Sequence, residues 1–455
     1  MISHGADSNI FSRDFNRVLP YADRGEGITI YDESGKGYID GCSGALISNV
    51  GHCVGEITDA ICSQLKQLTF AHPSQWNTRV AERAAAAVAE LSPGDLDYVF
   101  FVSGGSEAVE SALKLARQYY VEREGPDSQK HLIIGRWNSY HGATLGAMSA
   151  GGNMPRRRVF LPMLTSAPKL PPHYCYRCPY DMRYPACNVA CARELEKLVT
   201  DAGAERVAAF IAEPVVGSTV GALVPPDEYW PIVREICTRC DILLIADEIM
   251  TGFGRTGRAF GVDHWNVLPD MMAVAKGMGG GYVPAGGVVA SRRIVEAVKK
   301  GSGAYKHGFT YNGNPVSAAA VEAVINYIVE HDLIEHAKKM GVLLGSRLQQ
   351  LADLPIVGEV RGLGLMWGIE VVADKRNKRP FPAEAHAVGV VRDECIQRGL
   401  LIYPGGGMVE GRSGDNFMVA PPLMVGEDEV EKIAGIVEDA LHASAEKLGG
   451  AKTHA

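Results

Sequence analysis

The chain has 455 residues, 46% hydrophobic and 22% charged, with a net charge of −8; this length suits two or three parts with sizeable cores. The acidic balance argues against nucleic acid as a main partner, and no uninterrupted apolar run is long enough to span a membrane. Because MISHGADSNIFSRDF lacks the apolar centre of a secretory signal and the ten cysteines lie mostly in apolar segments, we expect reduced thiols and a cytoplasmic location.

The first predicted elements are a hairpin and a helical stretch. In ITIYDESGKGYIDG, Asp32 to Gly37 is the turn between two short strands, and residues 57–90 have an alanine-rich helical pattern. Apolar strands then alternate with helical segments from Tyr98 to Ala290. These strands are YVFFVS, HLIIGR, VAAFIAEPV, ILLIADE, MMAVAK and GGVVAS. The alternation predicts a mostly parallel sheet covered by helices on both faces.

The first of these strands leads through two glycines into a long helix that begins near Ser106, in YVFFVSGGSEAVESALKLARQYY. Backbone N–H groups and the helix dipole at such a junction bind anions. Gly104 and Gly105 allow close approach of the backbone, and Ser106 adds a hydroxyl. The alternative is that Ser106 caps the helix and the glycines form a tight turn.

Four cysteines lie within seventeen residues of a segment rich in proline and tyrosine. They are Cys175, Cys178, Cys187 and Cys191. The pattern C-x2-C followed by C-x3-C is similar to that of structural zinc sites, but the eight-residue gap between the pairs is shorter than in the usual zinc patterns. We therefore predict no metal and favour reduced thiols packed in a surface loop.

An acid and a lysine follow two neighbouring apolar strands. Ile242 to Ala246 reads as a buried parallel strand that delivers Asp247 and Glu248 to its carboxyl end, and Met271 to Ala275 presents Lys276 in the same way. Open α/β sheets bind ligands at this end of their strands. The pair suits pyridoxal 5′-phosphate (PLP), because the lysine binds the cofactor covalently and the acid keeps its pyridine nitrogen protonated.

Two other motifs that fit the same segment are rejected. An Asp-Glu pair after an apolar strand also occurs in Walker B motifs, but no G-x-x-x-x-G-K-[ST] loop accompanies it. Gly252, Gly254 and Gly257 spell G-x-G-x-x-G. A dinucleotide site would open a helix with an apolar face at this point, and RAFGVDHWNVLPD contains none.

The last third of the chain predicts a different architecture. Residues 315–351 form one long helix or two, and strands are expected near 357–371, 400–403 and 416–420, with helices between and after them. Strands and helices without βαβ regularity indicate a smaller α+β domain.

Four separated motifs in the region from Tyr31 to Leu423 resemble those of the class III (ω-type) aminotransferases. They are VSGGSEA, YHGAT, ADE with its following lysine, and GFTYNGNP. The resemblance implies PLP-dependent transferase fold type I, with a large domain around a mostly parallel seven-stranded sheet and a smaller α+β domain. It divides the chain into residues 1–60 (N-terminal segment of the small domain), 61–335 (large PLP-binding domain) and 336–455 (C-terminal small domain).

The resemblance also assigns cofactor contacts. The phosphate is expected at Gly104, Gly105 and Ser106, although relatives often carry Ser at the first position. Tyr140 is expected to stack on the ring beside His141. Glu213 is expected near the cofactor, where relatives pair this carboxylate with an arginine. Thr310 is expected to reach the phosphate of the neighbouring subunit. Without the family, Tyr140 would be an ordinary half-buried tyrosine and Thr310 a turn residue.

Substrate recognition is expected from three residues. Arg412 matches an arginine that clamps the carboxylate of keto acid substrates in relatives, although a single loop arginine is more often a solvated charge. Leu46 occupies a place where several relatives carry an aromatic pocket residue, and Trp76 supplies aromatic bulk from the following segment.

The sequence thus predicts a PLP-dependent transaminase that moves an amino group from an ω-amino acid or primary amine to a keto acid such as pyruvate. Its partners are the small-molecule donor and acceptor and a second copy of the chain, in a homodimer with shared active sites or a tetramer. Two alternatives stay open: a PLP-dependent decarboxylase or aminomutase of the same fold, and a catalytically silent PLP-fold binding protein.

Overall fold

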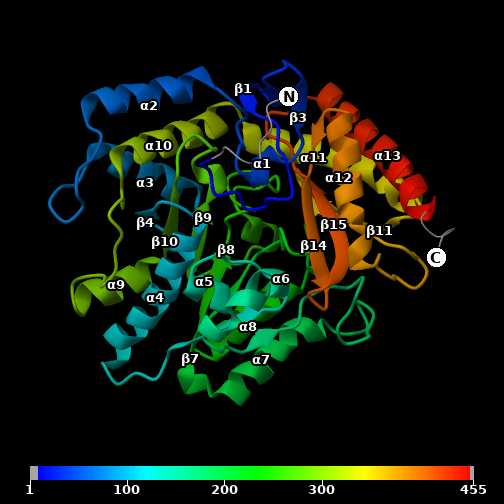
Figure 1. The fold of residues 1–455 in the computed structure, drawn as a ribbon. Helices are drawn as coiled ribbons and strands as arrows, with labels where there is room; N and C mark the ends of the chain where they lie inside the picture. Colours follow the sequence, from blue (N-terminus) through cyan, green and yellow to red (C-terminus); the bar gives the residue numbers. More distant parts are fainter. Residues whose placement is uncertain (1–8, 451–455) are drawn as a thin grey trace.

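The computed structural model describes residues 9–450 and has a seven-stranded sheet at its centre (Figure 1). Across the sheet the strands are β4 (Tyr98–Val102), β10 (Gly286–Ala290), β9 (Met271–Ala275), β8 (Leu243–Asp247), β7 (Val207–Ala212), β5 (Leu132–Arg136) and β6 (Lys169–Leu170). From β9 to β6 all neighbours are parallel, whereas β10 runs antiparallel to β9 and β4. The predicted mostly parallel, seven-stranded sheet is confirmed.

Alternating side chains of the central strands point into cores on opposite faces of the sheet. In β7, Ala209 and Ile211 join the core under α4 (Gly105–Glu124). Phe210 and Ala212 join the core formed with α7 (Ala190–Ala202) and α8 (Tyr229–Arg239). Burial on both faces explains why β7 and β9 are apolar throughout and why β8 is apolar up to Asp247, its last residue. The prediction of helices on both faces is therefore confirmed.

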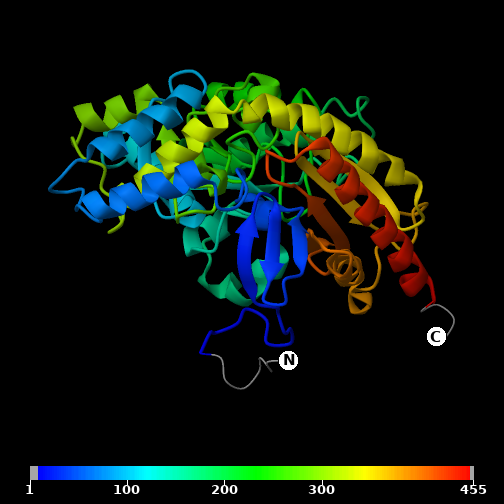
Figure 2. The ribbon, with the colours of Figure 1, turned by 90° about the horizontal axis from the view of Figure 1, so that it is seen from above.

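Further helices lie around this sheet or, for α11, α12 and α13, beside the C-terminal strands (Figures 1 and 2). They are α1 (Ser43–Leu46), α2 (Gly55–Gln67), α3 (Arg79–Leu91), α5 (Leu145–Ala150), α6 (Met154–Arg157), α9 (Arg292–Lys300), α10 (Pro315–Glu330), α11 (Leu333–Gln349), α12 (Ala387–Gln397) and α13 (Glu427–Gly450). Residues 315–351 hold two helices rather than one, because Asp332 adopts a left-handed φ of 50° between α10 and α11.

Two four-stranded sheets complete the structure. One orders β1 (Ala22–Glu26), β2 (Thr29–Asp32), β3 (Gly37–Asp40) and β13 (Leu400–Leu401), and the other orders β11 (Val357–Leu363), β12 (Met366–Val371), β15 (Ser413–Val419) and β14 (Tyr403–Val409). The predicted hairpin is β2–β3, and its turn is held by the Asp32 carboxylate, which accepts from the Ser34 and Lys36 N–H groups.

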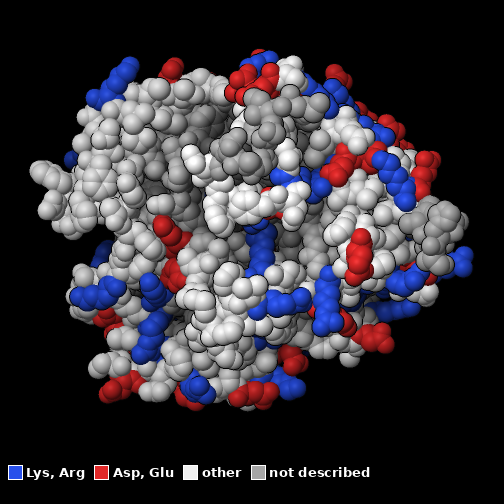
Figure 3. All heavy atoms as spheres, in the orientation of Figure 1, with Lys and Arg blue, Asp and Glu red and all other residues white. Residues whose placement is uncertain are grey.

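Strand β13 pairs in parallel with β3, so a C-terminal strand extends the N-terminal sheet. The division of the chain at residues 60 and 335 stays a prediction. On the face seen in Figure 3, acidic and basic side chains are interspersed. None of the helices in the described part of the chain is both long and apolar enough to cross a membrane.

Candidate active site

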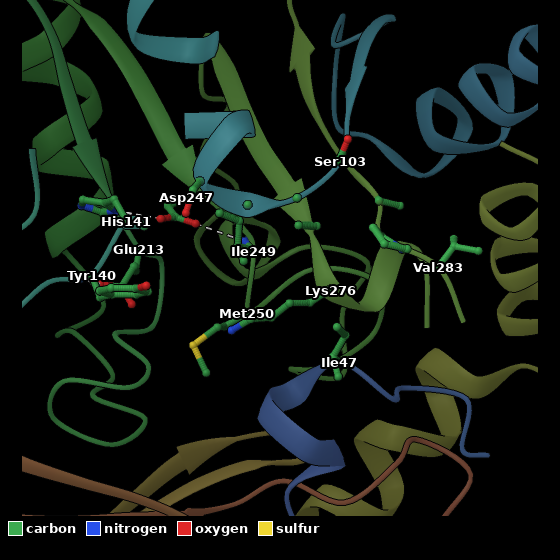
Figure 4. Close-up of a pocket in the computed structure, with 17 residues that line it drawn as sticks. Ile47, Ser103, Tyr140, His141, Glu213, Asp247, Ile249, Met250, Lys276 and Val283 are labelled. Atoms are coloured by element: carbon green, nitrogen blue, oxygen red, sulfur yellow. Dashed lines mark hydrogen bonds and ion pairs between the residues drawn. The ribbon is translucent and has the colours of Figure 1, made fainter. Parts of the chain in front are cut away.

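A cavity of about 250 Å³ opens beside the carboxyl ends of β8 and β9 (Figure 4). Eight predicted cofactor residues line it together: Gly104, Gly105, Ser106, Tyr140, His141, Glu213, Asp247 and Lys276. They come from five separate segments of the chain, which only the fold brings together. Open α/β sheets bind ligands at the carboxyl ends of their parallel strands.

Asp247 is the last residue of β8 and is held from two sides. Its Oδ2 lies 2.6 Å from Nδ1 of His141, and its Oδ1 accepts a hydrogen bond of 3.2 Å from the N–H of Ile249. The side chain is almost fully buried, at 3% exposure. The second ring nitrogen of His141, Nε2, is buried without a hydrogen-bond partner among the described residues. These contacts fix the direction in which the Asp247 carboxylate faces the cavity.

Glu248, the next residue, points away from the cavity. Its carboxylate accepts hydrogen bonds from the N–H groups of Gly261 and Val262, at 2.8 and 2.9 Å, and from the Thr251 hydroxyl. Burial raises its pKa to about 7. Because adjacent strand residues face opposite ways, the Asp-Glu pair divides into a cavity carboxylate and one that anchors the following loop.

That loop contains Gly254 and Gly257, both with positive φ, and it leads into a 3-10 helix of five residues, Gly261–Trp265, and not into an α-helix. Arg255 between them is buried and donates to four oxygens, those of Leu365, Pro421, Ser43 and Asn49. The segment therefore ties distant parts of the chain together, in agreement with the rejection of a dinucleotide fingerprint.

Lys276 follows β9 directly and extends across the cavity towards Tyr140 and Met250 (Figure 4). Its φ of 48° lies in the left-handed region, which is rare for a lysine and common at functional sites. Burial lowers the pKa of its amine to about 8, against the opposing influence of Asp247 and Glu213. A much larger share of the amine is therefore uncharged near neutral pH than in an exposed lysine.

The turn from β4 into α4 forms the opposite wall. A Cβ at Gly104 would meet nothing within 4 Å, so the backbone here faces open space. The first N–H groups of α4 have no acceptor within the helix, and its dipole favours an anion at this end. The Ser106 hydroxyl accepts from the N–H of Ala143, 3.0 Å away. Gly142 packs on Ser106, where a Cβ would lie 2.6 Å from the hydroxyl oxygen.

Glu213 and Tyr140 are joined through the backbone. The Glu213 carboxylate accepts from the N–H groups of Tyr140 and Gly217, at 3.1 and 2.9 Å, and burial raises its pKa. Arg136 donates to the backbone carbonyl of Glu213 rather than to its carboxylate. The expected carboxylate–arginine pairing therefore does not form among the described residues, and Glu213 positions the Tyr140 segment instead.

Four predicted residues do not line this cavity. Thr310 and Arg412 are exposed, and Trp76 is 68% exposed. Leu46 is buried in a core with Val215 and Met250. The left-handed φ of 58° at Leu46 sends the next residue, Ile47, into the cavity wall instead.

Sequence reasoning missed several apolar wall residues: Ile47, Ile249, Met250, Val283, Pro284 and Ala285. Ile249 and Met250 directly follow the Asp-Glu pair, and this position in the sequence could have indicated that they lie at the cavity. No pattern marks the others.

The four cysteines of residues 175–191 line a separate small cavity of about 20 Å³. All four are free thiols, and within residues 9–450 no group of three His, Cys, Asp or Glu side chains has an arrangement that could hold a metal. Burial raises the pKa of Cys191 to about 12, which disfavours the thiolate that a metal needs.

Protein purified without added metal is therefore expected to contain no stoichiometric zinc by elemental analysis. Replacing Cys175 and Cys178 by Ser should leave the metal content unchanged. Stoichiometric zinc that is lost in this double variant would contradict the expectation of packed thiols.

The known proteins to which this chain is similar are aminotransferases. Residues 10–441 match the sequence model of the family described as aminotransferase class-III. An uncharacterized aminotransferase, YodT, of Bacillus subtilis is 38% identical and covers 97% of this chain and 99% of its own length. A putrescine–pyruvate aminotransferase of Pseudomonas aeruginosa is 37% identical and covers 93% of this chain and 90% of its own length. The solved structure of the ω-transaminase of Pseudomonas jessenii in complex with PMP is 33% identical in sequence. It covers 95% of this chain and 94% of its own chain, with a TM-score of 0.88.

Proposed function

The chain belongs to the class III aminotransferases, PLP-dependent enzymes of fold type I, and we propose that it binds PLP in the cavity beside β8 and β9. There it transfers an amino group from an ω-amino acid or primary amine to a keto acid such as pyruvate. The main support for this proposal is that Lys276, Asp247 and the start of α4 line the same cavity.

The residues present fit this cofactor. The open backbone at Gly104 and the N-terminus of α4 suit its phosphate. The Asp247 carboxylate suits a protonated pyridine nitrogen, and Lys276 offers a buried amine of lowered pKa for the covalent attachment. Tyr140 lines the cavity with its ring, which suits stacking on a flat heterocycle.

Each of these residues has a task in the reaction. When bound, PLP withdraws electrons from the substrate carbon that carries the amine. Lys276 would hold the cofactor covalently, and its amine, when free, would take the proton from that carbon as general base and deliver it as general acid to the cofactor carbon at which the lysine is attached. Asp247 keeps a positive charge at the pyridine nitrogen, and His141 keeps Asp247 in place. Tyr140 orients the ring, and Glu213 orients Tyr140.

We assign the neighbouring subunit a part in the same site, in a homodimer with shared active sites or a tetramer. Thr310 is exposed and does not line the cavity of its own chain. The next residue, Tyr311, is 61% exposed and lies 5.8 Å from the ring of Phe70, which is 38% exposed. Trp76 follows Phe70 in the same loop. Exposed aromatic residues mark interaction surfaces, so this loop and Thr310 suit the cavity of a second copy.

Arg412 is proposed to bind the carboxylate of the keto acid. It lies in the turn between β14 and β15, exposed and without a carboxylate partner among residues 9–450. Arg412→Ala should raise KM for pyruvate and spare an aldehyde acceptor of similar size. A charge-assisted pair contributes roughly 1.5–3 kcal/mol, so kcat/KM should fall about ten- to a hundredfold. Equal losses for both acceptors would show that Arg412 has a structural role.

A screen of amine donors in the absence of acceptor tests the proposed function. An ω-amino acid or primary amine should change the absorbance of the bound cofactor, and pyruvate should restore it with formation of alanine. Release of CO2 without this exchange would favour a decarboxylase, and absorbance that no donor changes would favour a silent binding protein.

A further inference from the structure

A second arginine, Arg156, lies beside the proposed active site and is not explained by the cofactor. It belongs to the short helix α6, whose N-cap Asn153 accepts the Arg156 N–H at 3.3 Å. The central guanidinium carbon of Arg156 lies 4.3 Å from the centre of the Tyr140 ring. Tyr140 lines the cavity that contains Lys276, so the guanidinium lies against a side chain of the cavity wall.

Within the described part of the chain, no acidic side chain balances the charge of Arg156. Among residues 9–450 no carboxylate lies within ion-pair distance of its guanidinium, and the side chain is half-buried. The same positive charge is one of the influences that lower the pKa of Lys276, so it is felt at the reacting amine. A carboxylate ligand would stabilise a half-buried guanidinium that has no acidic side chain beside it.

The turn that carries Arg412 approaches the same segment. Arg158 donates to the carbonyl oxygen of Gly411 at 2.9 Å, and a Cβ at Gly411 would lie 2.5 Å from the Cβ of Met154 in α6. Arg156 and Arg412 are therefore on two segments that pack against each other, and Arg156 also contacts Tyr140. In Figure 3, basic side chains lie over the position that α6 has in Figure 1.

We infer that Arg156 is a specificity-determining residue that binds a carboxylate of the amine donor remote from the reacting nitrogen. The donor class is then an ω-amino acid rather than a diamine, because a second ammonium group would meet the unpaired guanidinium. This inference rests on the proposed transaminase function. A different role, in which Arg156 only supports the Tyr140 ring, would affect all donors alike.

The test uses three donors of similar length that differ at the far end: 4-aminobutyrate, butylamine and putrescine. The donor half-reaction is followed on the PLP-loaded enzyme without acceptor, so that the keto acid carboxylate does not contribute. Wild type should prefer 4-aminobutyrate. In Arg156→Gln, the second-order rate constant of the half-reaction with 4-aminobutyrate should fall about ten- to a hundredfold, mainly through weaker binding of the donor. Butylamine should change little, and putrescine should react faster than with wild type.

Arg156→Lys should recover part of the loss, since it restores the charge without the fork of donors. Arg206→Gln is the matched control, because it removes the same charge from an exposed arginine directly before β7, at the end of that strand opposite the cavity, and should leave the donor preference as in wild type. Binding of butyrate to the loaded enzyme, measured by calorimetry, should weaken in Arg156→Gln and not in Arg206→Gln. Both variants should melt within a few degrees of wild type.

Equal losses for all three donors in Arg156→Gln would overturn the inference in favour of support for Tyr140. A wild-type preference for putrescine, or an unchanged preference in Arg156→Gln, would also overturn it while the transaminase function stands. A wild type that changes the cofactor absorbance with none of the donors in the wider screen, and forms no alanine, would instead remove the proposed function itself.

Discussion

Lys276→Ala is expected to lose nearly all turnover, by at least about a thousandfold in kcat, because both the covalent attachment and the general base disappear. The variant should still bind PLP through the start of α4 and Asp247. Borohydride treatment of the native protein should fix PLP covalently on Lys276, and peptide mass spectrometry identifies the modified residue.

Lys169 supplies a matched control for this experiment. It is also buried, and burial lowers its pKa to about 8, but it lies outside the cavity and donates to the backbone oxygen of Ser149. Borohydride should therefore leave Lys169 unmodified, and Lys169→Met should keep the catalytic rate of the fraction that folds. Modification of Lys169 instead of Lys276, or turnover of Lys276→Ala within tenfold of wild type, would refute the assignment.

Asp247→Asn is expected to keep the fold, bind PLP more weakly and lose about a hundredfold or more in kcat. An amide cannot hold a positive charge at the pyridine nitrogen, whereas an opposite charge within about 4–6 Å shifts a pKa by about one to three units. The side chain keeps its size, so its packing against His141 should survive. Removal of the negative charge should also lower the pKa of Lys276 further below 8 in the cofactor-free protein, because Asp247 raises it.

Glu248→Gln tests whether this loss belongs to the cavity carboxylate. Glu248 anchors backbone N–H groups of the following loop, so its loss should lower the melting temperature, and PLP affinity should change much less than in Asp247→Asn. Steady-state kinetics and PLP titration of both variants separate the two roles. Near-normal kcat in Asp247→Asn would contradict the electron-withdrawing role of the cofactor that Asp247 is proposed to support.

Much of the large sheet was predictable, because its central strands β7, β8 and β9 are buried on both faces and almost entirely apolar, which leaves a clear signal. All six predicted strands of the sheet exist, and only the two-residue β6 was missed. The same logic placed Asp247 and Lys276 at neighbouring strand ends, since β8 and β9 pair in parallel. Where strands are short or helices are joined by a single left-handed residue, as at Asp332, periodicity carries no such signal.

The cavity wall was predicted less well. Leu46 and Ile47 are adjacent apolar residues, and the left-handed backbone at Leu46 decides which of them faces the cavity. A leucine in the sequence does not indicate a left-handed backbone, because bulky residues rarely adopt one. Arg156 gave no signal at all, because its approach to Tyr140 depends on the placement of α6 against a loop sixteen residues away.

The most direct test of the transaminase proposal follows the amino nitrogen itself. Purified protein loaded with PLP is incubated with unlabelled pyruvate and a panel of ¹⁵N-labelled ω-amino acids and primary amines, and the products are analysed by mass spectrometry. We expect ¹⁵N-labelled alanine in equal amount to the carbonyl product of one or more donors, with no CO2 released from the donor. Bound PLP together with CO2 release, or with no ¹⁵N in alanine for any donor, would contradict the proposed function.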